Sequence, residues 1–385
     1  MSNKIKSLLV VALLSLLPTL LVWLPFYLRI PEFWNIPLPQ KGMATIVSNY
    51  DGPLYIVVAK TLYNVEAIVR NYAISLPAEY YAAHFPLFPV LIRIFSYVLG
   101  YPYAMLTVTL ASSVLATYFF NKLIKQYLSG NAAIVATFAF VIFPARWLIV
   151  KSVGSTEPLF VATLIASVYY FKNQKYWWAG IWGALAQLTK SPGILLFVSY
   201  FLALVVPNLK SITTMSLGKW FKSLNLKTYP ILLIPLALLL VFVVYGITYK
   251  DFFAYFHSGD NIHLFFPPFQ IFNYSAPWVG TFWLEEVIFV YLIGALGFIN
   301  LVKQKENVLA WFVGVFFATT IFISHRDIIR YSLPIIPFLY IAFKDTIERK
   351  EFKYVLLFLI IPIYLFSLAY ISQNVMQISN WAPYL

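Results

Sequence analysis

Apolar segments long enough to cross a lipid bilayer recur along this sequence, and they constrain its fold more than any other feature. The first, from Leu8 to Leu28, has no charged side chain and is long enough to cross roughly 30 Å of hydrocarbon as a helix. Of the 385 residues, 61% are hydrophobic and only 11% are charged, and the mean hydropathy is +0.79. A soluble domain could not cover its surface with so few charges, so we predict an integral membrane protein in contact with the lipid bilayer.

The apolar segments predict an all-α, polytopic protein with about eleven transmembrane helices in a single domain, residues 1–385. The predicted spans are 8–28, 103–120, 132–150, 158–170, 177–188, 193–206, 229–249, 287–302, 308–324, 331–343 and 354–371. The two spans on either side of 189–193 could instead form one broken or re-entrant element. Residues 85–100 are also apolar but contain Arg93, and we interpret them as a helix packed at the outer surface rather than a span.

The distribution of charge predicts the orientation. Lys4 and Lys6 precede the first span, and most of the 27 Lys and Arg residues fall in loops on the same side, so we place the N-terminus in the cytoplasm. A cleavable signal peptide is the alternative, although Arg29 and bulky residues follow the first span instead of a small-residue cleavage site. The net charge of +13 therefore reflects membrane topology and not nucleic-acid binding. The membrane would be the plasma membrane in a prokaryote or the endoplasmic reticulum in a eukaryote.

Polar chemistry collects on the opposite, outer side, where the four His residues and most acids lie on this topology. The span centres hold almost no ionisable groups, which argues against an ion relay through the bilayer. The chain has no Cys, which excludes thiolate chemistry, and no Gly-rich phosphate loop or Ser nucleophile elbow is present. Any reaction is therefore expected at the outer membrane boundary.

Two outer loops are long, 29–102 and 250–286, and the first is too long and aromatic for a simple connector. Within it, Asp51 precedes a helical apolar period that begins near Leu54. From spacing alone, Asp51 could be an N-terminal helix cap or a functional acid.

Several segments in order along the chain resemble the PIG-V type of mannosyltransferase, a family of GT-C glycosyltransferases. They are NYDGPLYIVVA (49–59), HFPLFPVLIR (84–93), STEPLF (155–160), WWAGIWGALAQLTKSPG (177–193) and RYSLP (330–334). The resemblance implies a multi-span enzyme that moves a sugar, in this family mannose, from a polyprenyl- or dolichyl-phosphate donor to an acceptor hydroxyl on the outer face, with inversion. The acceptor could be a glycolipid, a glycan or a protein.

The resemblance also implies roles for particular residues. Asp51 matches the acid of the first outer loop and would be the catalytic base, because an inverting transfer needs a group that accepts the proton of the attacking hydroxyl. Glu157 would orient the acceptor or join Asp51 at a metal; its alternative is a solvated Glu in a first helical turn. No cofactor is predicted, and a divalent metal is allowed but not favoured, because Asp51 stands alone rather than in a paired acidic motif.

The leaving lipid phosphate needs positive charge. The outer bases near span ends are Lys190, Arg326, Arg330, Arg146, Lys151 and Arg93. Arg326 and Arg330 are four residues apart and share one helical face, so both could bind a single phosphate, unless they only mark the membrane boundary. His84 could contact the sugar or phosphate or serve as interfacial packing. The spacing of His257 and His263 matches no standard zinc pattern.

Two rival functions remain. One is a multi-span transporter or lipid flippase, which would normally show internal repeats and broken helices at mid-membrane. The other is a structural partner subunit without catalysis, in which replacement of Asp51 by Asn would have no effect. The sequence leaves the identity of the sugar and of the acceptor open.

Overall fold

The computed structural model describes residues 3–72, 76–208, 226–259, 264–273, 284–325 and 327–385. Helices form nearly all of it, and the one small sheet pairs β1 (Glu32–Phe33) with β2 (Ile36–Pro37) in antiparallel register. The all-α, polytopic prediction is confirmed. Five described helices are long and apolar enough to cross a membrane, or six if one bent pair counts as a span. They make the chain an integral membrane protein.

The eleven predicted spans all fall on helical segments of the described chain. Those matching the predictions closely are α1 (Asn3–Tyr27), α6 (Tyr101–Ile124), α9 (Glu157–Lys172), α10 (Tyr176–Thr189), α11 (Ile194–Val205), α14 (Leu233–Thr248), α16 (Leu284–Lys303), α17 (Asn307–Thr320) and α21 (Lys350–Gln373). The short 3-10 helices η3 (Val206–Asn208) and η4 (Leu226–Leu232) extend α11 and precede α14, respectively.

Two predicted spans are not straight helices. The segment 132–150 is divided between α7 (Gly130–Ile142) and α8 (Ala145–Lys151), which are bent by 67° at the break. The segment 331–343 is divided among α18 (Ile328–Ser332), η6 (Leu333–Ile335) and α19 (Ile336–Ala342). Pro residues at 144, 334 and 337 lie at these breaks, where they interrupt the helical hydrogen bonds. The short helix α20 (Lys344–Ile347) connects α19 to α21.

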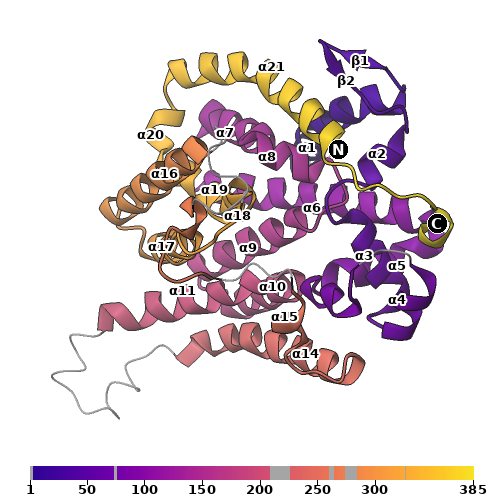
Figure 1. Ribbon diagram of the computed structural model, residues 1–385. Coiled ribbons are helices and arrows are strands. Elements are labelled where there is room, and N and C mark those ends of the chain that lie inside the picture. Colours follow the sequence, from indigo (N-terminus) through magenta and orange to yellow (C-terminus); the bar gives the residue numbers. More distant parts are fainter. Residues whose placement is uncertain (1–2, 73–75, 209–225, 260–263, 274–283, 326) are drawn as a thin grey trace.

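Helix α9 lies at the centre of the molecule and packs against α6 and α10 (Figure 1). Its residues from Glu157 to Val168 are all buried, which explains an apolar sequence without an amphipathic stripe. Two glycines bring α10 close to the segment formed by η4 and α14. A Cβ on Gly180 would lie 2.1 Å from the carbonyl oxygen of Pro230 in η4, and a Cβ on Gly183 would lie 2.6 Å from the side chain of Ile234 in α14. Such positions let membrane helices approach each other closely.

The first outer loop is folded into short elements that gather beside the C-terminal residues (Figure 1). They are α2 (Met43–Val47), α3 (Gly52–Thr61), α4 (Val65–Asn71), η1 (Ala78–Ala83) and α5 (Leu87–Leu99), together with η7 (Ala382–Tyr384) from the C-terminal segment. The later outer loop contributes α15 (Ala254–His257) and η5 (Gln270–Phe272), and Ile271 of η5 packs with Val287 and Ile328 in a separate cluster. Helix α15 packs on η1, and α3 packs on α5 and α6.

The predicted surface helix in this loop is α5, which is separated from α6 by Gly100 at a φ of 72°. Tyr97 and Val98 on it are more than 80% exposed, as expected for an apolar face toward lipid. Arg93, one turn before Tyr97, donates two hydrogen bonds, 3.0 and 2.9 Å long, to the carbonyl oxygens of Ala59 and Lys60. These carbonyls are in the last turn of α3, where they have no partner within the helix. The Arg within this apolar segment therefore fastens α5 to α3.

Candidate active site

A cavity of about 1540 Å³ lies where the first outer loop meets the ends of several helices. Asp51, His84 and Tyr55 line it from the first loop, and Glu157, Lys190 and Arg330 line it from the helical bundle. The structure thus brings all five described candidate residues to one cavity. The sixth candidate, Arg326, lies outside the described residues.

Glu157 is the centre of the polar cluster in this cavity. One of its carboxylate oxygens, Oε1, accepts a hydrogen bond of 2.7 Å from Arg330 Nε and another of 2.7 Å from Lys190 Nζ. The other oxygen accepts a hydrogen bond from the hydroxyl of Ser155. The Glu157 side chain is only 3% exposed, so it is not the solvated first-turn Glu that the sequence also allowed. Buried charges of this kind are stable only when paired, and here two cations share one carboxylate.

Asp51 occupies the N-cap position of α3, but its side chain makes no capping hydrogen bond. Its Oδ2 lies 3.4 Å from Arg330 Nη2 instead. The Asp51 side chain is 35% exposed, whereas Arg330 is 10% exposed. The structure therefore does not support a capping role for the Asp51 side chain: the carboxylate is directed into the cavity, where an incoming molecule can reach it.

Arg330 links the two acids, since its Nε binds Glu157 and its Nη2 faces Asp51. Its guanidinium carbon also lies 4.5 Å from the centre of the Tyr50 ring. A buried guanidinium held by two carboxylates is not a boundary-marking Arg whose charge extends into water. The planar, forked geometry of Arg suits this bridging position.

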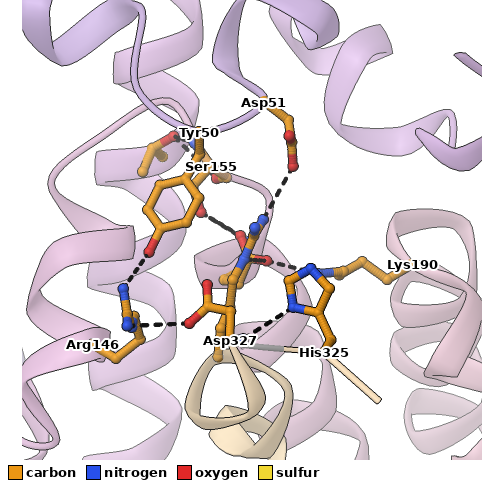
Figure 2. Close-up of polar contacts among 10 residues, drawn as sticks. Tyr50, Asp51, Arg146, Ser155, Lys190, His325 and Asp327 are labelled. Atoms are coloured by element: carbon orange, nitrogen blue, oxygen red, sulfur yellow. Dashed lines mark hydrogen bonds and ion pairs between the residues drawn. The ribbon is translucent and has the colours of Figure 1, made fainter. Parts of the chain in front are cut away.

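A second ion pair lies beside the first. Arg146 on α8 donates to the hydroxyl of Tyr50 at 2.9 Å and pairs with Asp327 at 3.2 Å (Figure 2). Its guanidinium also lies over the Tyr370 ring, at 3.9 Å. Tyr50 thus contacts both guanidinium groups, through its hydroxyl and its ring face. The cluster of Arg146, Lys190 and Arg330 with Asp51, Glu157 and Asp327 carries balanced formal charge.

The residues of this cluster lie at the ends or breaks of helices, and this explains how they converge. Glu157 is the first residue of α9, and Asp51 directly precedes α3. Lys190 lies in extended conformation between α10 and η2 (Ser191–Gly193). Asp327 directly precedes α18, which carries Arg330. Side chains at helix ends can turn into a shared space, whereas those within packed helices are held against their neighbours.

His84 is buried at the wall of the cavity, with 4% exposure. Its ring packs edge-on against Tyr55 with the centroids 4.7 Å apart, and its backbone carbonyl accepts a hydrogen bond of 2.6 Å from the Tyr63 hydroxyl. Burial, and next the charge of Glu157, raise the pKa of Tyr55 well above its ordinary value, so this phenol stays neutral. This part of the wall offers aromatic surface and neutral hydrogen-bonding groups.

Three other polar residues singled out from the sequence do not join the cluster. Arg93 binds α3, as described above, and Lys151 is buried against α1, where it donates a hydrogen bond of 2.6 Å to the Ser15 carbonyl. His257 pairs with Asp251 at 2.6 Å on the surface, and this hydrogen bond lowers the pKa of Asp251. His263 lies outside the described residues. No group of three or more His, Asp or Glu side chains that could hold a metal is found among the described residues.

Sequence reasoning missed the roles of Tyr50 and Asp327 in this arrangement. Tyr50 directly precedes Asp51, and Asp327 lies three residues before Arg330, so adjacency to a candidate was the available signal. This signal was too weak, because both residues are positioned by Arg146, which is distant from them in sequence.

No protein-family model matches the sequence, and no curated protein matches it. Among solved structures, the chain is similar to ArnT from Cupriavidus metallidurans bound to undecaprenyl phosphate, with a TM-score of 0.56 and 16% sequence identity. The similarity covers 88% of this chain and 60% of the ArnT chain, so the chain spans only part of the length of that protein. ArnT is a polytopic protein of the GT-C type. The chain therefore has the GT-C fold.

Proposed function

We propose that the protein is a glycosyltransferase that moves a sugar from a polyprenyl-phosphate donor to an acceptor hydroxyl, with Asp51 as the catalytic base. The observation that carries the proposal is the position of Asp51: a partly exposed carboxylate in a large cavity, beside Arg330 and close to the ion pair of Glu157 and Lys190. A base and an anion-binding cation in one cavity are what transfer from a phosphate-linked sugar requires.

The reaction follows from these groups. The Asp51 carboxylate takes the proton of the acceptor hydroxyl as that oxygen forms a bond to the anomeric carbon. The bond from the anomeric carbon to the donor phosphate breaks on the opposite face, and its electron pair stays on the phosphate oxygen. The products are the inverted glycoside, polyprenyl phosphate with one additional negative charge, and protonated Asp51.

Lys190 and Arg330 would stabilise the phosphate as this charge develops. Both already bind the carboxylate of Glu157, which holds them in place without a ligand. Protonation of Asp51 removes the negative charge beside Arg330 at the moment when the phosphate gains one. The proton transfer thereby makes the Arg330 charge more available to the leaving group.

Two similarities to known proteins, one in structure and one in sequence, support the proposed donor and sugar. ArnT, which shares the fold, is bound to undecaprenyl phosphate in its crystal structure, and this supports a polyprenyl-phosphate donor. The ordered segments that resemble the PIG-V type of mannosyltransferase favour mannose as the sugar. The charge distribution between loops favours a site on the outer face of the membrane. We expect transfer without a divalent metal, because the Glu157 carboxylate is already paired with Lys190 and Arg330.

The test is sugar transfer from radiolabelled polyprenyl-phosphate-mannose by the purified protein, with and without EDTA. We expect transfer by the native protein in EDTA, and a decrease of about 10²- to 10⁴-fold in Asp51→Asn, the usual effect of losing a general base. Asp251→Asn is the matched control, because Asp251 is an acid paired with His257 on the surface. Binding of undecaprenyl phosphate should persist in the Asp51 variant.

Native-like transfer by Asp51→Asn would contradict the role of Asp51. If the native protein transfers no sugar from polyprenyl-phosphate-mannose or from other lipid-phosphate sugars, the proposed activity is wrong. Transport of the lipid is then the function to test.

A further inference from the structure

The loop that carries Asp51 has an unusual backbone. Tyr50 has a φ of 48°, in the left-handed region that residues with a Cβ rarely adopt. Gly52 follows, and a Cβ at this position would lie 2.6 Å from the carbonyl oxygen of Val47. A strained, crowded turn of this kind persists only when surrounding contacts fix it. Contacts with neighbouring segments therefore have to fix Tyr50 and Asp51 in this conformation.

Asn49 supplies the main side-chain contacts on the other side of the turn. Its side chain is completely buried. The amide nitrogen Nδ2 donates a hydrogen bond of 2.8 Å to the backbone carbonyl of Ile371, in the last turn of α21. The oxygen Oδ1 accepts a hydrogen bond of 3.2 Å from the side-chain amide of Asn374. One carboxamide therefore uses both its donor and its acceptor to bind the end of α21.

The backbone reinforces this connection. Asn49 and Val375 form an antiparallel bridge, and the Met376 amide donates a hydrogen bond of 2.7 Å to the Ser48 carbonyl. Residues 373–376 also line the cavity. The segment that follows α21 is thus both a wall of the cavity and the support of the loop that carries Asp51.

The same helix end reaches the second ion pair. Tyr370 on α21 stacks against Tyr50 with ring centroids 5.8 Å apart, and its ring lies against the Arg146 guanidinium. Asn49 therefore holds together two parts of the site from opposite ends of the sequence. A shift of α21 relative to the loop would move Tyr50 directly and Asp51 with it.

We propose that Asn49 is a positioning residue, which fixes the Asp51 carboxylate in the cavity by fastening its loop to the end of α21 and to residues 374–376. The catalytic consequence rests on the proposed function; the positioning itself does not. Asp at position 49 could not do this, because a carboxylate has no donor for Ile371 and would place negative charge beside that carbonyl oxygen.

The first experiment compares the native protein with Asn49→Asp and Asn49→Ala. We expect kcat for sugar transfer to fall about 10- to 100-fold, since displacement of a reacting group by about 1 Å has effects of that size, while KM for the donor stays within about threefold. Amide hydrogen exchange at Gly52 and Tyr55 should become faster, because these amides bond to the carbonyl oxygens of Asn49 and Asp51. The control is Asn71→Asp, at an exposed residue of α4 in the same loop, which should change neither kcat nor the exchange at Gly52 and Tyr55.

The second experiment restores the connection covalently. The chain contains no Cys, so Asn49→Cys with Val375→Cys introduces one thiol pair. Bridged antiparallel residues have Cα atoms about 4.5–5.5 Å apart, within the range that a disulfide spans. The oxidised double variant should recover most of the kcat lost in its reduced form, and the slow exchange at Gly52 should return. This comparison is made within one folded protein, so a general folding defect cannot imitate it.

Native kcat and exchange in Asn49→Asp would overturn the proposal. So would loss of kcat with unchanged exchange, because Asn49 would then act on the substrate directly, and so would a fully oxidised double variant no more active than its reduced form. If the native protein transfers no sugar, the proposed function is wrong, and the exchange measurements alone then decide whether Asn49 fixes the loop.

Discussion

At the scale of single residues, the site is a balance of buried charges around Glu157. Arg330 and Lys190 both depend on that carboxylate, and Arg330 also faces Asp51. Removing the central acid leaves two mostly buried cations without their shared partner. The result is a loss of both stability and site geometry.

We therefore predict that Glu157→Gln lowers the free energy of unfolding by about 3–5 kcal/mol, the usual effect of breaking a buried ion pair. Transfer activity should fall with it, since Lys190 and Arg330 lose their fixed positions. The measurement is thermal unfolding in detergent, followed by transfer assays at a temperature where the variant is folded.

Glu306→Gln is the matched control. Glu306 pairs with Lys172 where α9 ends and α17 begins, away from the cavity, and both side chains are less buried than Glu157. We expect a cost of about 1 kcal/mol and unchanged kcat. Equal destabilisation by the two variants would argue against a special role for the Glu157 cluster.

At the scale of elements, the site depends on where helices end and how closely they pack. The sequence predicted the existence and type of the helices well, because long apolar runs admit few alternatives in a bilayer. It did not predict the 67° bend between α7 and α8, which gives Arg146 its direction into the cavity. Pro144 marks where the helix is interrupted, but the angle of the bend depends on which neighbours each half packs against.

Close packing of α10 leads to a prediction at this scale. Gly180→Ala should destabilise the protein by about 1–3 kcal/mol, as overpacking usually does, because the added methyl would lie 2.1 Å from the backbone oxygen of Pro230. Gly246→Ala on α14 is the control, since its nearest neighbour is at 3.8 Å, and it should be neutral or stabilising. Thermal unfolding of the two variants measures the difference. Similar melting temperatures would mean that α10 and η4 are farther apart than described.

At the scale of the whole molecule, the loop charges predict which side of the membrane the polar cluster faces. The absence of Cys makes this testable, since any introduced thiol is unique. Asn71 lies on exposed α4 of the first outer loop, and Asn173 follows α9 at the opposite side of the predicted topology.

In intact cells or sealed vesicles of native orientation, a membrane-impermeant thiol reagent should label Asn71→Cys directly. It should label Asn173→Cys only after the membrane is opened. The reverse labelling pattern would place the cavity on the cytoplasmic face and contradict the prediction of an outer-face site. The description of the fold would still hold.

The sequence by itself determined that the chain is a helical membrane protein, because apolar length is a local property. It identified Asp51, Glu157, Lys190 and Arg330 as candidates from their places in the first outer loop or near the ends of predicted spans and from the resemblance to the PIG-V type of mannosyltransferase. Only the tertiary structure decided which of the bases serve the cavity. Arg93 and Lys151 look equivalent to Arg330 in sequence, yet they bind backbone carbonyls elsewhere. The support of Asp51 by Asn49 was likewise invisible, since it joins residues 322 positions apart. A charged side chain takes its role from the partners that surround it, and those partners are brought together by packing of distant segments.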